Sequence, residues 1–142
     1  METRIVLDTS VFIAALLGPR GPSRETLRRC LNRRYVPLMG TALFLEYESV
    51  LSREHLFANC RLNRQQRDTL FDAFVSVCQW QPVYYTWRPN LVDEADNHIV
   101  ELAVAGQAGV IVTNNTRDFV RAELYFSGLR ILPPETFIQE TS

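Results

Sequence analysis

The stretch RIVLDTSVFI, residues 4–13, decides the fold. Its apolar run, residues 5–7, is typical of a strand that is buried on both faces of a parallel sheet. Asp8 ends this run, and Thr9 or Ser10 can cap the apolar helix that follows. A carboxylate between a strand and a helix lies at the carboxyl edge of the sheet, where open α/β folds bind ligands. Asp8 is therefore either a candidate functional residue or an ordinary helix cap, and this stretch leaves both interpretations open.

The rest of the chain alternates apolar runs with amphipathic segments. Further strands are predicted over residues 35–39, 82–85, 110–113 and 129–132. Helices are predicted over residues 11–17, 23–34, 41–51, 64–78, 93–105 and 119–125, with Ser23, Thr41 and Asn63 as possible caps and a last turn through Ile138. This alternation predicts one α/β domain, residues 1–142, folded as a three-layer α/β/α sandwich around a central parallel sheet of four to five strands.

The composition indicates in which cellular compartment the protein lies and which kind of metal ion it can bind. Hydrophobic residues make up 46% and charged residues 22%, as in an ordinary water-soluble domain. No apolar run approaches the roughly 20 residues that span a bilayer, and the N-terminus lacks the pattern of a signal peptide, so we expect a cytoplasmic protein with no membrane partner. Three irregularly spaced cysteines and two histidines argue against a disulfide framework or a zinc site. Oxygen ligands are plentiful, which favours Mg²⁺ or Mn²⁺.

The basic residues are unevenly placed. The net charge is -1, all fifteen basic residues are arginines, and six of them lie between Arg20 and Arg34, opposed there only by Glu25. A near-neutral total with a local cluster indicates an anion-binding face rather than a generally basic protein. Arg24 and Arg28 are candidates for binding phosphates because guanidinium groups suit them, although a solvated helix face explains them equally well.

Acidic residues recur where the predicted strands end and the next helices begin. Asp8 follows the first strand, Glu46 lies early in the helix after the second, Asp96 is near a helix start, and Asp118 follows a later strand. Carboxylates that converge at one edge repel one another unless a cation lies between them. Such a cluster predicts a hard divalent cation, which can activate water and neutralise the charge that develops on a phosphodiester. Asp93 is a rival to Asp96.

Several other sites that place an acid at this edge are excluded. Phospho-receiver domains and P-loops both require a lysine, and the chain has none. Aspartyl phosphatases need a second Asp where this chain has Ser10. No glycine-rich turn follows the first strand, which excludes a dinucleotide site. Among enzymes, these exclusions leave metal-dependent phosphodiester hydrolysis.

Four motifs together resemble a PIN domain, most closely the VapC-like toxin nucleases of prokaryotic toxin–antitoxin systems. They are Asp8-Thr9-Ser10, Leu45-Glu46-Tyr47, Asp96-Asn97, and Val112-Thr113-Asn114-Asn115-Thr116-Arg117-Asp118-Phe119. The resemblance covers nearly the whole chain. It implies a PIN-like sandwich and a Mg²⁺- or Mn²⁺-dependent endoribonuclease, with a cognate antitoxin as partner and a homodimer or higher oligomer as its assembly.

The resemblance also implies the roles of individual residues. The catalytic set is Asp8, Glu46, Asp96 and Asp118, and Asp8 and Asp96 are the direct metal ligands. The expected substrate-binding residues are Arg24, Arg28, Ser10 and Asn115. Many relatives carry an acid at the position of Asn115 and an Asn at the position of Ser10. The first departure keeps a second hypothesis open, in which the chain is a weakly active or inactive scaffold that binds RNA or a protein partner.

Overall fold

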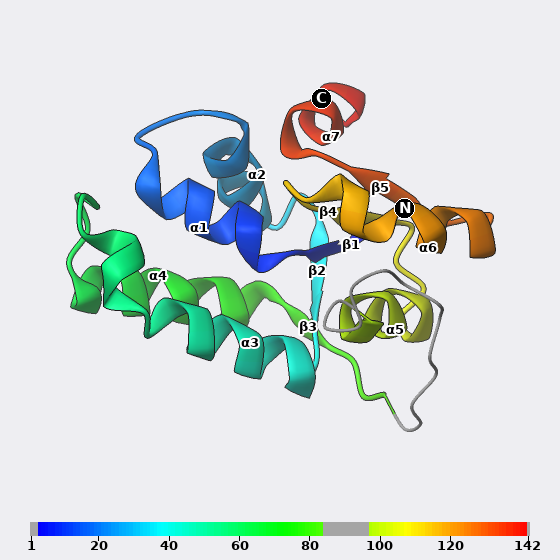
Figure 1. Cartoon of the computed structure of the whole chain (residues 1–142), viewed down its shortest axis with the longest axis horizontal. Helices are drawn as coiled ribbons and strands as arrows, with labels where there is room; N and C mark the ends of the chain where they lie inside the picture. Colours follow the sequence, from blue (N-terminus) through cyan, green and yellow to red (C-terminus); the bar gives the residue numbers. More distant parts are fainter. Residues whose placement is uncertain (1–2, 84–96, 142) are drawn as a thin grey trace.

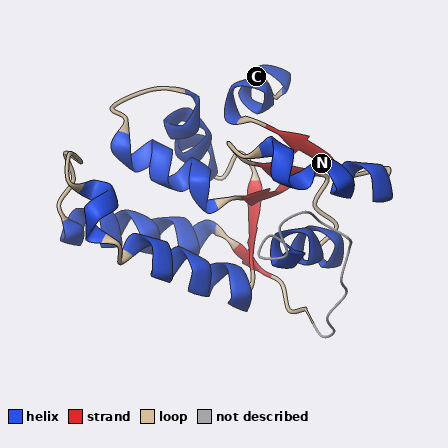
Figure 2. Ribbon diagram, viewed as in Figure 1, coloured by secondary structure: helices blue, strands red, loops and turns tan. Residues whose placement is uncertain are grey.

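The computed structural model describes residues 3–83 and 97–141, and its elements alternate along the chain as predicted (Figures 1 and 2). The strands are β1 (Arg4–Leu7), β2 (Val36–Met39), β3 (Gln79–Trp80), β4 (Val110–Val112) and β5 (Arg130–Leu132). The helices are α1 (Thr9–Leu17), α2 (Pro22–Leu31), α3 (Thr41–Leu51), α4 (Arg64–Val77), α5 (Asn97–Ala105), α6 (Val120–Tyr125) and α7 (Pro134–Glu140), with short 3₁₀ turns η1 (Glu54–Phe57) and η3 (Thr116–Phe119).

The five strands form one parallel sheet in the order β3-β2-β1-β4-β5. The central strand is β1, in which Ile5 pairs with Val110 and Leu7 with Val112. Side chains 5–7 are at most 1% exposed, as expected for a strand that is covered on both faces. The predicted α/β class and the parallel sheet of four to five strands are confirmed.

Helices cover both faces of the sheet. In Figure 1, α1, α3 and α4 lie to the left of β2 and β3, and α5 lies to their right. The helices on the left share an aromatic cluster, in which the ring of Phe12 is 5.4 Å from that of Tyr47 and 5.5 Å from that of Phe74. This packing fixes α1, α3 and α4 relative to one another. Among the described residues, no helix is both long enough and apolar enough to cross a membrane.

The predicted boundaries were wrong at several places. The third strand is Gln79–Trp80 rather than residues 82–85; Pro82 and Val83 are not in a strand, and the rest of that segment lies outside the described residues. Asn63 caps α4 as predicted, through a capping box with Gln66. The predicted caps of α1, α2 and α3 were wrong. Asp8 occupies the cap position of α1, the cap residues of α2 and α3 are glycines, and none of the three helices has a side-chain cap.

Candidate active site

The candidate site lies at the carboxyl ends of β1 and β4. From β1 the chain continues to β2, which is the neighbour of β1 on one side. The neighbour of β1 on the other side is β4, which comes later in the sequence. The space outside β1 and β4 is therefore a topological switch point, where open α/β sheets bind ligands. Asp8 follows β1 and Thr113 follows β4, and the backbone N–H of Asp8 donates to the carbonyl of Val112 at 3.0 Å.

Asp8 is held by two hydroxyl groups. Thr113 Oγ1 donates to Asp8 Oδ2 at 2.6 Å, and Ser10 Oγ donates to the same oxygen at 2.9 Å. Both hydroxyls are themselves oriented, because the backbone N–H of Asn115 donates to Thr113 Oγ1 at 2.9 Å and that of Asn114 donates to Ser10 Oγ at 3.1 Å. The turn after β4 is thus tied to the start of α1 through the Asp8 carboxylate. Asp8 occupies the cap position of α1, but its side chain makes no capping hydrogen bond.

The surroundings of Asp8 disfavour its charged form. Only 4% of the residue is exposed, and burial is the main cause that raises its pKa above the usual 3.8. The hydroxyls of Thr113 and Ser10 act in the opposite direction, and the nearby charge of Glu46 raises the pKa further. The charged form of Asp8 is disfavoured although its carboxylate accepts two hydroxyl hydrogen bonds. Stability alone therefore does not explain an acid at this position.

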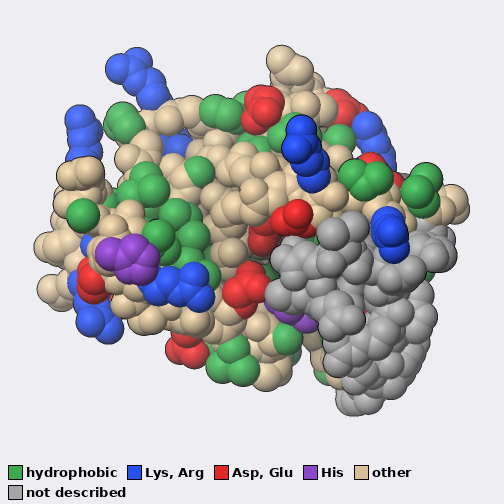
Figure 3. All heavy atoms as spheres, in the orientation of Figure 1, with side chains coloured by type: hydrophobic (Ala, Val, Ile, Leu, Met, Phe, Trp, Pro, Cys, Tyr) green, Lys and Arg blue, Asp and Glu red, His purple; other side chains and the backbone are tan. Residues whose placement is uncertain are grey.

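Glu46 is brought to the same edge by α3. The next residue along the helix, Tyr47, is buried and donates its hydroxyl hydrogen to the carbonyl of Leu7 at 2.7 Å. This contact fixes the middle of α3 against the end of β1, one residue before Asp8. The Glu46 carboxylate then accepts a hydrogen bond at Oε2 from Thr9 Oγ1, at 3.2 Å. Figure 3 shows acidic side chains gathered near the middle of this face, with a histidine beside them.

The histidine that contacts Glu46 is His98, in the first turn of α5. Its Nε2 lies 3.0 Å from Glu46 Oε1. Sequence reasoning missed this residue, together with the part that Thr9 and Thr113 play in holding the two carboxylates. Thr9 is 37 residues from Glu46 and His98 is 52 residues away, so no local spacing indicates these contacts. Thr9 and Thr113 lie within motifs that the sequence analysis identified, but neither motif indicates these contacts.

The other predicted acids do not enlarge the described pair. Asp96 and its rival Asp93 lie outside the described residues. Asp118 is half-buried in η3, where its backbone N–H donates to the carbonyl of Asn115 at 3.0 Å. Within residues 3–83 and 97–141, no group of three or more His, Cys, Asp and Glu side chains lies close enough to hold a metal ion.

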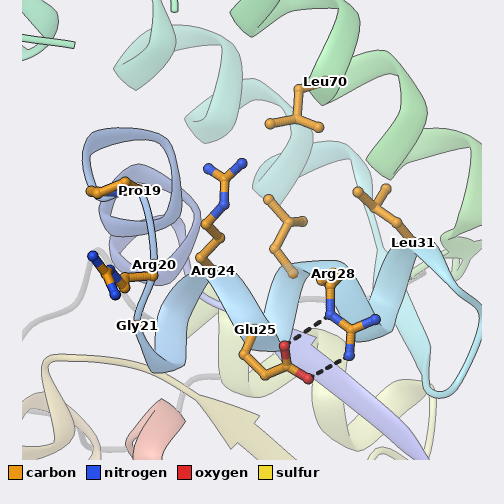
Figure 4. Close-up of a pocket in the computed structure, with 9 residues that line it drawn as sticks. Pro19, Arg20, Gly21, Arg24, Glu25, Arg28, Leu31 and Leu70 are labelled. Carbon is orange, nitrogen blue, oxygen red and sulfur yellow. Dashed lines mark hydrogen bonds and ion pairs between the residues drawn. The ribbon is translucent and has the colours of Figure 1, made fainter. Parts of the chain in front are cut away.

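The four predicted substrate-binding residues fall into two groups. Ser10 and Asn115 lie at the site, through the hydrogen bonds to Asp8 and Thr113. Arg24 and Arg28 line a different cavity, of about 400 Å³, between the turn after α1, α2 and α4 (Figure 4). Arg28 is paired with Glu25 through two hydrogen bonds of 2.8 and 2.7 Å, and Arg24 Nη1 lies 3.4 Å from the carbonyl of Ala15.

The donor atoms of the site are of the kind that a hard divalent cation prefers. Asp8 and Glu46 offer carboxylate oxygens, the ligands that Mg²⁺ and Mn²⁺ prefer. The two hydroxyls that orient Asp8 both bind Oδ2, and neither contacts Oδ1. A cation between the two carboxylates would relieve the repulsion that raises the pKa of Asp8.

Comparisons with known proteins bear on the family and the fold of the chain. A sequence profile of a family described as PIN domain matches residues 4–117. No curated protein sequence is significantly similar to the chain.

Solved structures that share the fold include the following two. A chain of VapBC2 from Rickettsia felis, in the crystal structure with a DNA fragment from their promoter, superposes with a TM-score of 0.62 at 15% identity, over 92% of this chain and 98% of the other. PAE2754 from Pyrobaculum aerophilum superposes with a TM-score of 0.59 at 14% identity, over 98% of this chain and 89% of the other.

Proposed function

Because this chain belongs to the PIN domain family, we propose that it is a nuclease that hydrolyses RNA phosphodiester bonds with a bound Mg²⁺ or Mn²⁺ ion. The observation that carries the proposal is the pair formed by Asp8 and Glu46 at the switch point of the sheet. The pair is close enough for the charge of Glu46 to raise the pKa of Asp8, and hydroxyl groups hold both carboxylates in place. Such a pair is unfavourable when empty and becomes favourable when a cation binds.

Each acidic residue has a proposed role. Asp8 and Asp96 would hold the ion directly, while Asp118 would act directly or through a water molecule. When bound, the ion would lower the pKa of a water ligand and neutralise charge that develops on the scissile phosphate. Ser10 and Thr113 keep the Asp8 carboxylate in one orientation. Glu46 would complete the ion's ligands or orient the attacking water.

The partners follow from the same proposal. The similar structure from Rickettsia felis is of VapBC2, and its fold supports the inference that this chain is the toxin of a toxin–antitoxin pair with a cognate antitoxin protein. We also propose a cytoplasmic protein that forms a homodimer or higher oligomer. Ser10 and Asn115 would contact RNA next to the cleaved bond. Arg24 and Arg28 would bind phosphates further along the strand, since their cavity lies on α2 and α4.

The experiment compares the cleavage of a labelled RNA by the wild type and by Asp8→Asn, each purified in EDTA and then supplied with Mn²⁺ or Mg²⁺. We expect cleavage by the wild type only after the metal is added, and none above background by Asp8→Asn. Asp72→Asn makes the same chemical change at an exposed position on α4 and should cleave like the wild type. A contaminating ribonuclease would appear equally in all three preparations.

The second candidate function is a scaffold that binds RNA or protein without cleaving. Asn115, at a position where many relatives carry an acid, favours this alternative. Equal RNA binding by the wild type and Asp8→Asn, without cleavage in either metal, would support the scaffold and contradict the nuclease. Isothermal titration with Mn²⁺ separates the two further, because a nuclease should bind the ion in a way that Asp8→Asn largely abolishes.

A further inference from the structure

Glu46 is held at both of its carboxylate oxygens. Thr9 Oγ1 lies 3.2 Å from Oε2, and His98 Nε2 lies 3.0 Å from Oε1. These partners come from different elements, α1 and α5, so the carboxylate lies between the helices on either side of it. Because a carboxylate only accepts hydrogen bonds, Nε2 of His98 must carry the hydrogen that it donates.

The imidazole is costly at this position. His98 Nδ1 is buried and has no hydrogen-bond partner within the described part of the chain. A buried polar atom without a partner destabilises a folded protein, so an apolar side chain would serve better for packing alone. The apolar residues that follow it in α5, Ile99 and Val100, are fully buried and show that this helix can present such side chains to the core. The contact with Glu46 is what the imidazole provides and an apolar side chain cannot.

The pair also differs from an ordinary surface ion pair. The side chains of His98 and Glu46 are 23% and 26% exposed, so both are largely removed from water. A hydrogen bond to a charged group is stronger and more directional in such surroundings than on an open surface. It can therefore select one orientation of the carboxylate.

We propose that His98 is a positioning residue, which donates from Nε2 to Glu46 Oε1 and, together with Thr9 on the other oxygen, holds the Glu46 carboxylate toward Asp8. This inference rests on the proposed nuclease function of the site. His98 does not touch the reacting atoms; it acts through Glu46. Each oxygen of Glu46 keeps a lone pair for the ion or the attacking water after accepting one hydrogen bond.

The test uses three variants, with RNA titrated up to saturation and Mn²⁺ held at a saturating concentration. His98→Leu removes the donor and should lower kcat by about 10- to 100-fold, the usual loss when a partner of a metal-site ligand is removed, while the KM for RNA stays unchanged. His98→Gln can place an amide N–H near the position of Nε2 and should recover most of the loss. His55→Leu removes the other histidine, which is exposed in η1, and should behave like the wild type.

Two further measurements exclude a merely structural role. In the Glu46→Ala background, which has no side-chain acceptor, His98→Leu should cause no additional loss, because both changes remove the same contact. In the metal-free wild type, nitrogen NMR of the imidazole should show the hydrogen on Nε2, and Glu46→Leu should shift that resonance. The NMR result needs no activity and applies even if His98→Leu fails to fold.

The outcomes separate this inference from the proposed function. If neither metal supports cleavage by the wild type, the nuclease proposal fails. If the wild type cleaves and His98→Leu cleaves at the same rate, only the role of His98 is overturned. Equal losses in His98→Gln and His98→Leu, additive losses with Glu46→Ala, or an Nε2 without a hydrogen in the wild type would also overturn it.

Discussion

Replacing Thr113 with valine tests whether its hydroxyl supports a charged Asp8. Valine has nearly the shape of threonine, so Thr113→Val removes the 2.6 Å hydrogen bond to Asp8 Oδ2 and little packing. Thr113 is fully buried and Asp8 is 4% exposed, so water cannot readily replace the lost donor. The remaining hydroxyl, that of Ser10, still donates to the same oxygen at 2.9 Å.

The expected loss in the free energy of unfolding is about 2 kcal/mol at neutral pH, since hydrogen bonds to charged groups contribute about 1.5–3 kcal/mol. For a chain of 142 residues this corresponds to a decrease in Tm of roughly 6 °C. The matched control is Thr113→Ser, which keeps the hydroxyl and loses one buried methyl group, at a cost of about 1 kcal/mol.

The effect of the valine should depend on pH. Burial already raises the pKa of Asp8 above 3.8, and the hydrogen bond from Thr113 opposes that shift, so the variant should have a still higher pKa. A raised pKa means that ionisation destabilises the folded state as the pH rises from 3.8 through the folded-state value. The penalty of Thr113→Val should therefore be largest at neutral pH and decrease as the pH falls toward 3.8, where only a neutral hydrogen bond of about 1 kcal/mol is lost.

Urea unfolding in EDTA at several pH values between 4 and 8 measures this dependence for all three proteins. The penalty of Thr113→Ser should stay constant over the range, because it reflects packing. In the Asp8→Asn background, Thr113→Val should cost only about 1 kcal/mol at every pH. A penalty for Thr113→Val that is equal at both ends of the range, or unchanged by Asp8→Asn, would refute the reasoning.

Three further predictions concern other parts of the chain. In EDTA, Asp8→Asn should unfold at a higher urea concentration than the wild type, and a less stable Asp8→Asn would contradict the repulsion argument. Mn²⁺ at about 100 times its Kd should stabilise the wild type by about 2.7 kcal/mol and leave the stability of the variant unchanged. Phe12→Ala should cost about 4 kcal/mol in urea unfolding, because Phe12 is fully buried; a loss below that of Thr113→Val would show that the aromatic cluster does not hold α1. Arg24→Gln, made in the non-cleaving Asp8→Asn protein, should weaken RNA binding and reduce the salt slope of log K by about 0.7; an unchanged slope in a filter-binding assay would exclude a phosphate contact.

The fold could be predicted from the sequence where burial dictates the pattern. The runs at 5–7 and 110–112 are apolar because β1 and β4 are covered on both faces, and such strands tolerate no polar side chain. The strand Gln79–Trp80 could not be found this way. It is only two residues long, pairs on one side with β2, and leaves Trp80 about half exposed, so it needs no apolar run. Aromatic residues just after Pro82 gave a stronger strand signal than the strand itself.

The candidate site was predictable to the extent that each carboxylate follows an element that ends or begins at the carboxyl edge. Asp8 follows a buried strand, and Glu46 lies early in the helix after the next strand, so topology alone brings them together. The groups that hold these carboxylates were not predictable in the same way. Whether a hydroxyl or an imidazole lies within hydrogen-bond distance of a carboxylate depends on how α1, α3 and α5 pack. Such contacts produce no periodic pattern in the sequence.

The arrangement of these supporting groups explains why the site can favour a cation without being filled by its own hydrogen bonds. Both hydroxyls that bind Asp8 donate to Oδ2, and Glu46 receives one donor on each oxygen. The orientations are thereby fixed, yet burial still raises the pKa of Asp8 above its usual value. Had the same donors neutralised the pair fully, a cation would gain little by binding, because its charge would replace interactions already made. A fixed and incompletely compensated pair instead gives an incoming divalent ion both a defined geometry and a favourable free energy of binding.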